Sequence, residues 1–193
     1  MTKMIRCLFT TLVFALVVAP SAVGQDAVPS IAEPKDHLFP GVTNAKVTQA
    51  NINTNICKAN WTATIRPPTS YTNALKREQL KTLSYTTPNP LPNVKSKSGK
   101  KMIPDLTKCK EHSANPSCWE EDHLISLQLG GDPRSPDNLW PEPWFGPWNA
   151  RIKDALETKL KRMVCAGQIP LSEAQQAIAT DWVAAYKKYV GPQ

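Results

Sequence analysis

Several features that define common classes of protein are missing from this chain. Its five cysteines include no Cys-x-x-Cys pair, which excludes the paired zinc knuckles of many small domains. No segment is repeated, so a solenoid or propeller is excluded. The long apolar run at residues 8–18 is too short for a comfortable membrane span. The length of 193 residues fits one domain.

The first 24 residues have the pattern of a secretory signal peptide. Lys3 and Arg6 form a charged start, an apolar run follows, and the small residues 22–24 precede Gln25. An uncleaved anchor is the alternative. No lipid-attachment cysteine follows the expected cleavage point. We therefore expect a periplasmic or secreted protein with no stable membrane association after cleavage.

Export removes Cys7 and leaves four cysteines that would meet an oxidising compartment, so two disulfides are expected. Four cysteines allow three pairings. The short, turn-rich segment between Cys109 and Cys118 favours that pair, which leaves Cys57 with Cys165. A zinc site is the rival interpretation, although its spacing is not that of a common zinc motif. Its ligands would be Cys109, His112, Cys118 and His123.

The net charge of +7 falls to +5 once Lys3 and Arg6 are removed with the signal peptide. A modest positive charge suits a polyanionic partner, although many exported proteins are basic for other reasons. Lysines concentrate in residues 95–110, where Asp105 is the single acidic residue. This stretch is either a solvated loop or an arm that contacts phosphates.

The chain before residue 56 carries weak structural signals. Prolines at positions 29, 34 and 40 predict a flexible lead-in over residues 25–55. Alternating apolar positions in residues 42–56 are compatible with a short strand. The Pro67-Pro68 pair and the hydroxyls after it predict a surface helix over about 73–83.

Two longer helices are predicted near the C-terminus. The first spans about 148–165, because apolar residues recur at every fourth position of it, and Gly167 is placed to cap it. Ser172 and Gln175 predict a capping box at the start of the second, which runs to about Tyr189. With one sparse β element and three helices, residues 56–193 are expected to form a single α+β domain.

The side chains suited to acid–base chemistry or metal binding lie between Glu120 and Asn149. Hydrolysis of a phosphodiester needs a base to deprotonate water and a cation to stabilise charge. Asp122 and His123 offer a metal ligand and a base at consecutive positions, and Asn149 can offer a second oxygen. Neighbours in a strand point to opposite faces, so the pair must lie at a strand end or at a distortion in order to share a site. Asn138 can tie the intervening loop and hold His123 in place.

An Asp-His pair alone is more often a local surface contact, but its order and spacing here are informative. His123 and Asn138 are 15 residues apart, Asn138 and Asn149 are 11 apart, and a Gly-Gly pair lies between the first two. The stretch resembles the HNH endonucleases of the ββα-metal (His-Me finger) superfamily. The matching residues are Asp122-His123, the LISL that follows, Gly130-Gly131 and Asn138-Leu139.

The surrounding chain is similar to a group of small exported bacterial proteins of this class over most of its length after Asn55. The similar runs are ICKANWTATIRPPTSYTNALKREQ, DHLISLQLGG, NLWPEPW and WNARIKDALETKL. The resemblance implies a small ββα-metal core with additional helices, stapled by disulfides in place of zinc knuckles.

The resemblance also implies roles for individual residues. His123 matches the general base, Asp122 the metal ligand, and Asn138 the residue that orients the loop. Asn149 matches the last metal ligand, where histidine is commoner, and Glu142 and Glu121 are alternatives. The implied cofactor is one divalent metal, with Mg²⁺ preferred and Mn²⁺, Ca²⁺ or Zn²⁺ as alternatives.

The expected activity is metal-dependent cleavage of DNA, with RNA as an alternative and little sequence selectivity. Arg151 and Lys153 are candidates to clamp a phosphate. The aromatic residues of 140–148 either stack on bases or pack beneath the following helix. A nucleic-acid-binding protein without turnover and an exported protein-interaction module are the alternatives. The sequence does not indicate the oligomeric state.

Overall fold

The computed structural model describes residues 39–83, 93–110 and 113–192. The protein is an α+β structure with two small antiparallel sheets and two disulfides. The predicted signal peptide, His37 and His112 lie outside the described residues. No helix in the described ranges is long and apolar enough to cross a membrane.

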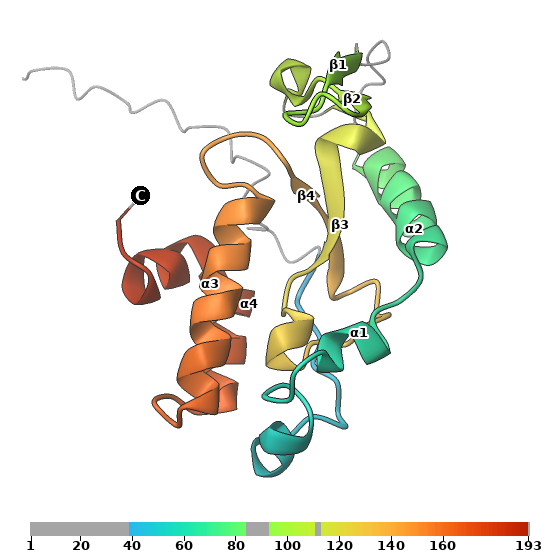
Figure 1. Ribbon diagram of the computed structural model, residues 1–193. Coiled ribbons are helices and arrows are strands. Elements are labelled where there is room, and N and C mark those ends of the chain that lie inside the picture. Colours follow the sequence, from blue (N-terminus) through green and yellow to red (C-terminus); the bar gives the residue numbers. More distant parts are fainter. Residues whose placement is uncertain (1–38, 84–92, 111–112, 193) are drawn as a thin grey trace, which may run out of the picture.

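A two-stranded sheet of β3 (Trp119–His123) and β4 (Leu139–Pro143) lies at the centre of the molecule (Figure 1). The register pairs Trp119 with Pro143 and His123 with Leu139. Because side chains alternate along a strand, Glu121 and His123 share one face with Trp119, while Glu120 and Asp122 share the other. Helix α2 lies on one side of the sheet and α3 with α4 on the other (Figure 1).

Two helices precede the sheet, α1 (Trp61–Ile65) and α2 (Thr69–Thr82). Pro68, whose φ is −65°, forms the N-cap of α2, so this helix starts four residues before the predicted position 73. Its inner face buries Leu80 and Lys76 against β3. The helix was expected to lie on the surface with thin packing, and these two contacts fix it to the sheet.

Helices α3 (Ala150–Cys165) and α4 (Leu171–Tyr189) match the two helices predicted near the C-terminus. The apolar stripe of α3 packs against Ile178 and Trp182 of α4 in the main core. Gly167 ends α3 with a φ of +69°, a conformation that favours glycine. The predicted capping box is wrong, because Pro170 is the N-cap of α4 and Gln175 donates to the carbonyl of Leu129 instead.

Residues 39–55 differ from the expected flexible lead-in and short strand. They contain the 3-10 helix η1 (Gln49–Thr54), and Val47 and Ile52 are buried in the main core. Thr43 forms an isolated bridge with Gly131. Local composition suggested flexibility, but these apolar side chains fill space beside the loop that follows β3, so the segment belongs to the domain.

Both favoured disulfides are present. Cys57–Cys165 joins the start of the domain to the end of α3, and Cys109–Cys118 spans nine residues just before β3. Their presence fits an oxidising environment. The sulfurs of Cys109 and Cys118 bond to one another, so the rival zinc site is wrong.

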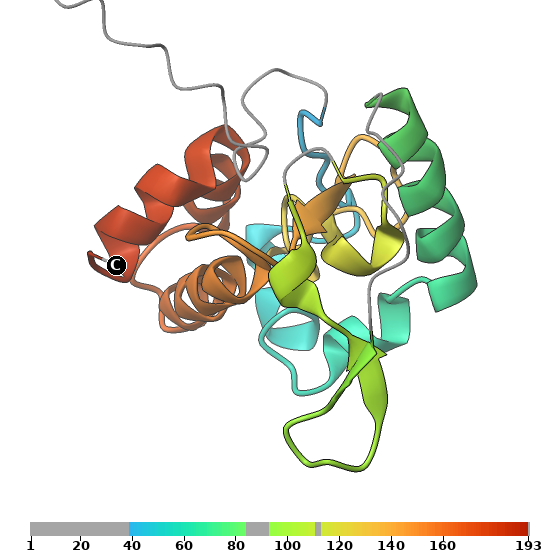
Figure 2. The same ribbon diagram turned by 90° about the horizontal axis from the view of Figure 1, so that it is seen from above.

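The lysine-rich stretch forms a hairpin where a loop was expected. Strands β1 (Asn93–Lys95) and β2 (Met102–Pro104) pair antiparallel, and the hairpin projects from the body of the protein (Figure 2). Three short 3-10 helices complete the described elements. They are η2 (Leu106–Lys108), η3 (Pro116–Cys118) and η4 (Leu127–Leu129).

Candidate functional site

His123 is the last residue of β3, the strand-end position that a shared Asp-His site requires. Its Nε2 atom lies 3.1 Å from the carbonyl oxygen of Pro133. A carbonyl only accepts hydrogen bonds, so Nε2 carries the proton and Nδ1 of the neutral ring keeps its lone pair. Burial lowers the pKa of His123, which leaves the ring neutral at pH 7. The imidazole is therefore oriented and in the correct state to accept a proton.

A cavity of about 240 Å³ opens beside His123, between α2 and the face of β3 that carries Trp119. Although His123 is only 3% exposed, it forms part of the cavity wall. The cavity is lined by cationic and hydroxyl groups and by the carboxyl groups of Glu120 and Glu121, so it can admit water. Its polar lining residues include Arg66, Thr69, Thr72, Asn73, Lys76 and Glu121.

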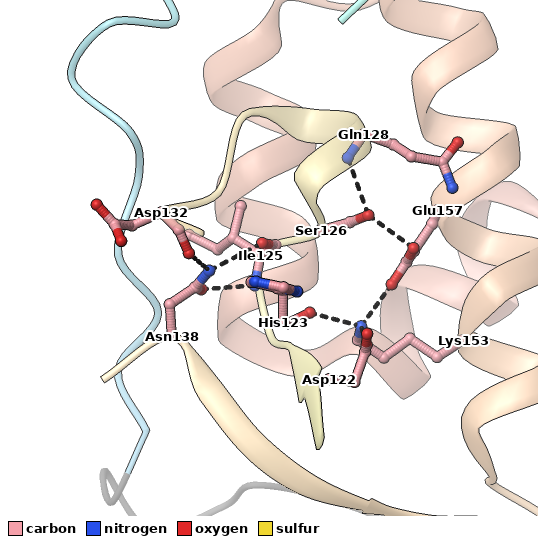
Figure 3. A network of polar contacts seen from close by, with 9 residues as sticks. All are labelled: Asp122, His123, Ile125, Ser126, Gln128, Asp132, Asn138, Lys153 and Glu157. Carbon is pink, nitrogen blue, oxygen red and sulfur yellow. Dashed lines mark hydrogen bonds and ion pairs between the residues drawn. The ribbon is translucent and has the colours of Figure 1, made fainter. Parts of the chain in front are cut away.

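Asn138 braces the loop that joins β3 to β4 (Figure 3). Its Oδ1 accepts from the backbone N–H of Ile125 at 2.9 Å and of Val42 at 3.3 Å. Its Nδ2 donates to the carbonyls of Ile125 at 3.1 Å and Asp132 at 2.9 Å. The side chain is fully buried and uses its whole amide. Since Pro133 follows Asp132 directly, this brace also places the carbonyl that orients His123.

The Gly-Gly pair is required by the same loop. A Cβ atom on Gly131 would lie 1.7 Å from the Ile125 carbonyl oxygen and 2.8 Å from Nδ2 of Asn138. Gly130 has a φ of +73°, and a Cβ there would meet Val47 at 2.6 Å. The pair therefore allows the backbone to pass close to the Asn138 amide.

Lys153 was expected to lie on an exposed face and contact phosphate, but it is fully buried. Its Nζ donates to Oδ2 of Asp122 at 2.6 Å, to the carbonyl of His123 at 2.8 Å and to Oε1 of Glu157 at 2.6 Å (Figure 3). An ammonium group has three N–H donors, and all three are used. Lys153 therefore cannot clamp a phosphate and instead fixes the end of β3 to α3.

This network extends through Glu157 to the loop after β3. Ser126 donates from Oγ to Oε2 of Glu157 at 2.6 Å and accepts from the N–H of Gln128 at 3.1 Å (Figure 3). Burial acts to raise the pKa of Asp122, but the charge of Lys153 and the hydrogen bonds from Lys153 and Glu142 together lower it. For Lys153, burial and the neighbouring charges shift the pKa in the opposite directions. Burial would lower its pKa, but the carboxylates of Asp122 and Glu157 raise it. Asp122 is thus held as an anion.

The other carboxyl groups of the sheet have raised pKa values. Burial, with help from Asp122, raises the pKa of Glu120 to about 7. Burial raises that of Glu121 to about 8, against the attraction of Lys76. Burial also raises the pKa of Glu142 well above its usual range, and both of its carboxyl oxygens are buried. Glu142 is therefore protonated at neutral pH and able to donate to the adjacent Asp122.

Asn149 is the N-cap of α3. Its Oδ1 accepts from the N–H of Arg151 at 3.1 Å, and its Nδ2 donates to the carbonyl of Gly146 at 2.8 Å. Arg151 is exposed, with its guanidinium 5.9 Å from the centre of the Trp144 ring. Among the described residues, no hydrogen bond joins Asn149 to Asp122 or His123.

The donor atoms allow a narrow choice of metal. Within the described ranges, no three His, Cys, Asp or Glu side chains are grouped so that they could hold an ion. Zn²⁺ usually needs three or four nitrogen and sulfur ligands, whereas Mg²⁺ keeps several waters and needs one or two carboxylates. The side chain of Asp122 is 19% exposed, so a carboxylate edge remains available beside its bond to Lys153. A single carboxylate of this kind is compatible only with an ion that keeps most of its water, such as Mg²⁺. Glu121 shares its face of β3 with His123, opposite the face that carries Asp122, so Asp122 and His123 can act at one site only because they lie at the strand end.

The aromatic stretch serves mainly to pack the domain. Trp148 makes edge contacts with Trp182 at 5.8 Å and Tyr186 at 5.7 Å between ring centres. Trp119 makes a similar contact with Phe145 at 5.3 Å. Trp144 differs because it lines the cavity beside His123. It is therefore placed to contact a ligand there.

Four residues of the site were missed in the sequence. Lys76 donates to the carbonyl of Trp119 at 2.9 Å, and Arg66 reaches the cavity from the end of α1. Ser126 and Glu157 belong to the Lys153 network. The Lys153–Glu157 spacing of four residues was a usable signal, although that spacing usually marks a surface pair.

No protein-family model matches this chain, no curated protein is significantly similar to it, and no solved structure matches it. The function must therefore be argued from the site itself.

Proposed function

We propose that this protein is an exported endonuclease that hydrolyses phosphodiester bonds of DNA, with RNA as a second possible substrate. The main support is the state of His123. Its ring is fixed through Nε2 by the Pro133 carbonyl, and its free Nδ1 belongs to a residue that lines a cavity of about 240 Å³. A general base requires a neutral, oriented imidazole next to a space that can hold a water molecule.

The proposed reaction starts with a water molecule in this cavity. Nδ1 of His123 takes a proton from it, and the water oxygen attacks phosphorus as the bond to the leaving oxygen breaks. Arg66, which is exposed and lines the same cavity, is positioned to contact the phosphate charge. Among the described residues Arg66 forms no ion pair with a carboxylate, so its guanidinium is available.

Asp122 is the residue that we propose holds a hydrated divalent cation, with Mg²⁺ as the first choice. Such an ion would supply positive charge to the scissile phosphate and the leaving oxygen. Lys153 keeps Asp122 ionised, and Asn138 keeps His123 in place through Pro133. Oδ1 of Asn149 retains a second lone pair, which leaves it as the candidate for a further ligand.

The order of elements supports the same proposal. The acid and the base lie at the end of β3, the bracing asparagine precedes β4, and α3 follows and contributes Lys153. This arrangement of two strands and a helix agrees with the resemblance to HNH endonucleases noted in residues 122–139. A ββα-metal core is therefore part of the proposal, and the additional α1, α2 and α4 surround it.

The test is a plasmid-nicking assay with the purified, oxidised protein in Mg²⁺, Mn²⁺, Ca²⁺ or Zn²⁺ and in EDTA. We expect nicking with Mg²⁺ and none in EDTA. His123→Ala should lower the rate by about 100-fold or more, the usual contribution of a general base. Asn53→Ala, at an exposed position outside the cavity lining, is the control and should cut at the normal rate. Circular dichroism and thermal melting would establish that each variant is folded.

Two other results would replace this function. A folded wild-type protein that binds DNA in a salt-dependent manner but cuts with no metal would be a non-catalytic nucleic-acid-binding protein. A folded protein that ignores polyanions at physiological salt would instead be an interaction module for another exported protein. If His123→Ala cuts as fast as the wild type, the assignment of the base is wrong.

A further inference from the structure

The β1–β2 hairpin has an unusual surface. Of the large apolar side chains exposed in the described part of the chain, three of four lie in this hairpin. Val94 is 40% exposed, Met102 53% and Ile103 36%. Val94 pairs with Ile103 across the two strands, and Met102 points to the opposite face. The hairpin therefore presents apolar groups on both faces.

The same hairpin carries a concentrated positive charge. Lysines occupy positions 95, 97, 100 and 101, and residues 93–104 contain no acidic residue. All four lysines are exposed, and none of them forms an ion pair with a carboxylate of the described residues. The nearest acid along the chain is Asp105, whose Oδ1 is already bonded to the hydroxyl of Thr107 at 2.6 Å. No ion pair within residues 39–83, 93–110 and 113–192 therefore neutralises this positive charge.

The hairpin is held in a defined place. Its turn is closed by the N–H of Ser96, which donates to the carbonyl of Lys101 at 2.7 Å, and by Gly99 with a φ of +69°. The Cys109–Cys118 disulfide follows η2 and anchors the base of the hairpin directly before Trp119, the first residue of β3. A two-stranded hairpin alone is marginally stable, so this anchor is what fixes it to the body.

We propose that the β1–β2 hairpin is a docking element that enters a groove of duplex nucleic acid. The major groove admits a two-stranded β-ribbon, and apolar side chains such as methionine and isoleucine can contact or separate base steps in the minor groove. The four lysines would contact the flanking phosphates. This inference rests on the proposed function only for the choice of nucleic acid as the partner.

The hairpin and His123 lie at opposite ends of β3 (Figure 1). A five-residue strand spans roughly 13 Å at about 3.3 Å per residue. That length equals about four base-pair steps of 3.4 Å. A duplex that lies along β3 would thus meet the hairpin several base pairs away from the phosphate at His123.

A membrane surface is a less suitable partner for this hairpin. Interfacial anchors usually combine basic residues with a broad apolar face containing tryptophan, phenylalanine or leucine. Here three partly exposed side chains are split between two faces, and no aromatic residue occurs in residues 93–104. The charge complements a polyanion, and the apolar area matches a groove contact more closely than insertion into lipid.

The test compares two triple variants with the same change of charge. Lys97→Gln, Lys100→Gln and Lys101→Gln remove the hairpin charge, while Lys46→Gln, Lys58→Gln and Lys159→Gln remove three exposed lysines elsewhere. Each triple variant is combined with His123→Ala and assayed in EDTA, so that binding is measured without cleavage. Fluorescence anisotropy of a 20-base-pair duplex is followed as salt is varied.

We expect the hairpin triple to bind at least about tenfold more weakly and its slope of log affinity against log salt to become shallower by roughly 2 to 3. The control triple should change affinity by less than about threefold. A further variant, Met102→Ser with Ile103→Ser, should weaken binding several-fold and leave the salt slope unchanged. Equal losses in both triples, or no loss in the hairpin triple, would overturn the proposal.

Two further measurements separate this proposal from its alternatives. Vesicles with and without phosphatidylserine are tested in parallel, and loss of vesicle binding alone in the hairpin triple would reassign the hairpin to a lipid surface. Hydrolysis of bis(p-nitrophenyl) phosphate, a substrate too small to reach the hairpin, should be the same in the hairpin triple as in the wild type. Failure of that hydrolysis in the wild type, with duplex binding intact, would refute the nuclease but leave the hairpin proposal standing.

Discussion

The Nζ atom of Lys153 lies 2.6 Å from Oδ2 of Asp122 and is fully buried, so the acid beside His123 has an internal counter-ion. Glu157, which lies one turn further along α3, binds the same ammonium group at a distance of 2.6 Å. The three groups form a buried cluster in which two carboxylates depend on one cation.

Replacing Lys153 by methionine should therefore destabilise the protein strongly. Asp122 and Glu157 would be left without compensation, and loss of one partner of a buried ion pair typically costs about 3–5 kcal/mol. The deficit should grow from pH 5 to pH 8, because the two acids can escape the penalty by protonation only at low pH. Urea unfolding of the variant and the wild type at pH 5 and at pH 8 measures this loss of unfolding free energy. Adding Glu157→Gln should recover part of the loss, and exposed Lys159→Met is the control.

Asn138→Ala should impair both stability and catalysis. The substitution leaves the buried N–H of Ile125 without an acceptor, at a cost of about 1–3 kcal/mol for that group alone. It also releases the Asp132 carbonyl next to Pro133, so His123 loses its fixed orientation. We expect kcat to fall more than affinity for the duplex, which is measured in EDTA. Exposed Asn53→Ala should leave both unchanged, and an unaltered kcat in a folded Asn138→Ala protein would contradict the bracing role.

Glu121→Gln should stabilise the protein at high pH. Burial raises the pKa of Glu121 to about 8 from 4.5, so between these values the folded state binds more protons than the unfolded state. Stability contributed by this group is present below pH 4.5 and is lost as pH rises to 8. The variant removes that loss, and we expect a gain of roughly 1–3 kcal/mol at pH 8 and little at pH 5. Denaturant titrations check this, with Glu78→Gln as a surface control. A gain of equal size at both pH values would indicate a packing effect instead.

The two disulfides should differ in the stability that they provide. The loop-entropy relation gives about 4.8 kcal/mol for the separation of 108 residues between Cys57 and Cys165, and about 2.6 kcal/mol for the nine-residue separation of Cys109 and Cys118. Double serine variants of each pair, compared by thermal and urea unfolding, measure the difference. The ranking would be refuted if the Cys109–Cys118 variant proved the less stable of the two.

The sequence predicted the parts of the structure that depend on local pattern. Apolar recurrence located α3, and the short spacing of Cys109 and Cys118 indicated their pairing. The close passage of backbone at Gly131 explains the Gly-Gly pair in physical terms.

The features that depend on distant residues could not be predicted. Lys153 lies beside the apolar stripe of α3, where a lysine normally reaches solvent, and it is buried only because Asp122 arrives from β3. Residues 39–55 looked flexible in composition, yet Val47 is buried beside Gly130. The start of α4 was misplaced because Gln175 meets the Leu129 carbonyl, a partner 46 residues away.

The Cys57–Cys165 bond has a consequence for biosynthesis. On the proposed export route, a chain that emerges N-terminus first would deliver Cys57 to the oxidising compartment well before Cys165, which follows 108 residues later. Cys109 and Cys118 would arrive in between and could join each other locally. The thiol of Cys57 must remain reduced, or exchange out of a wrong partnership, until translocation is nearly complete. The second of these routes requires disulfide isomerisation as well as oxidation.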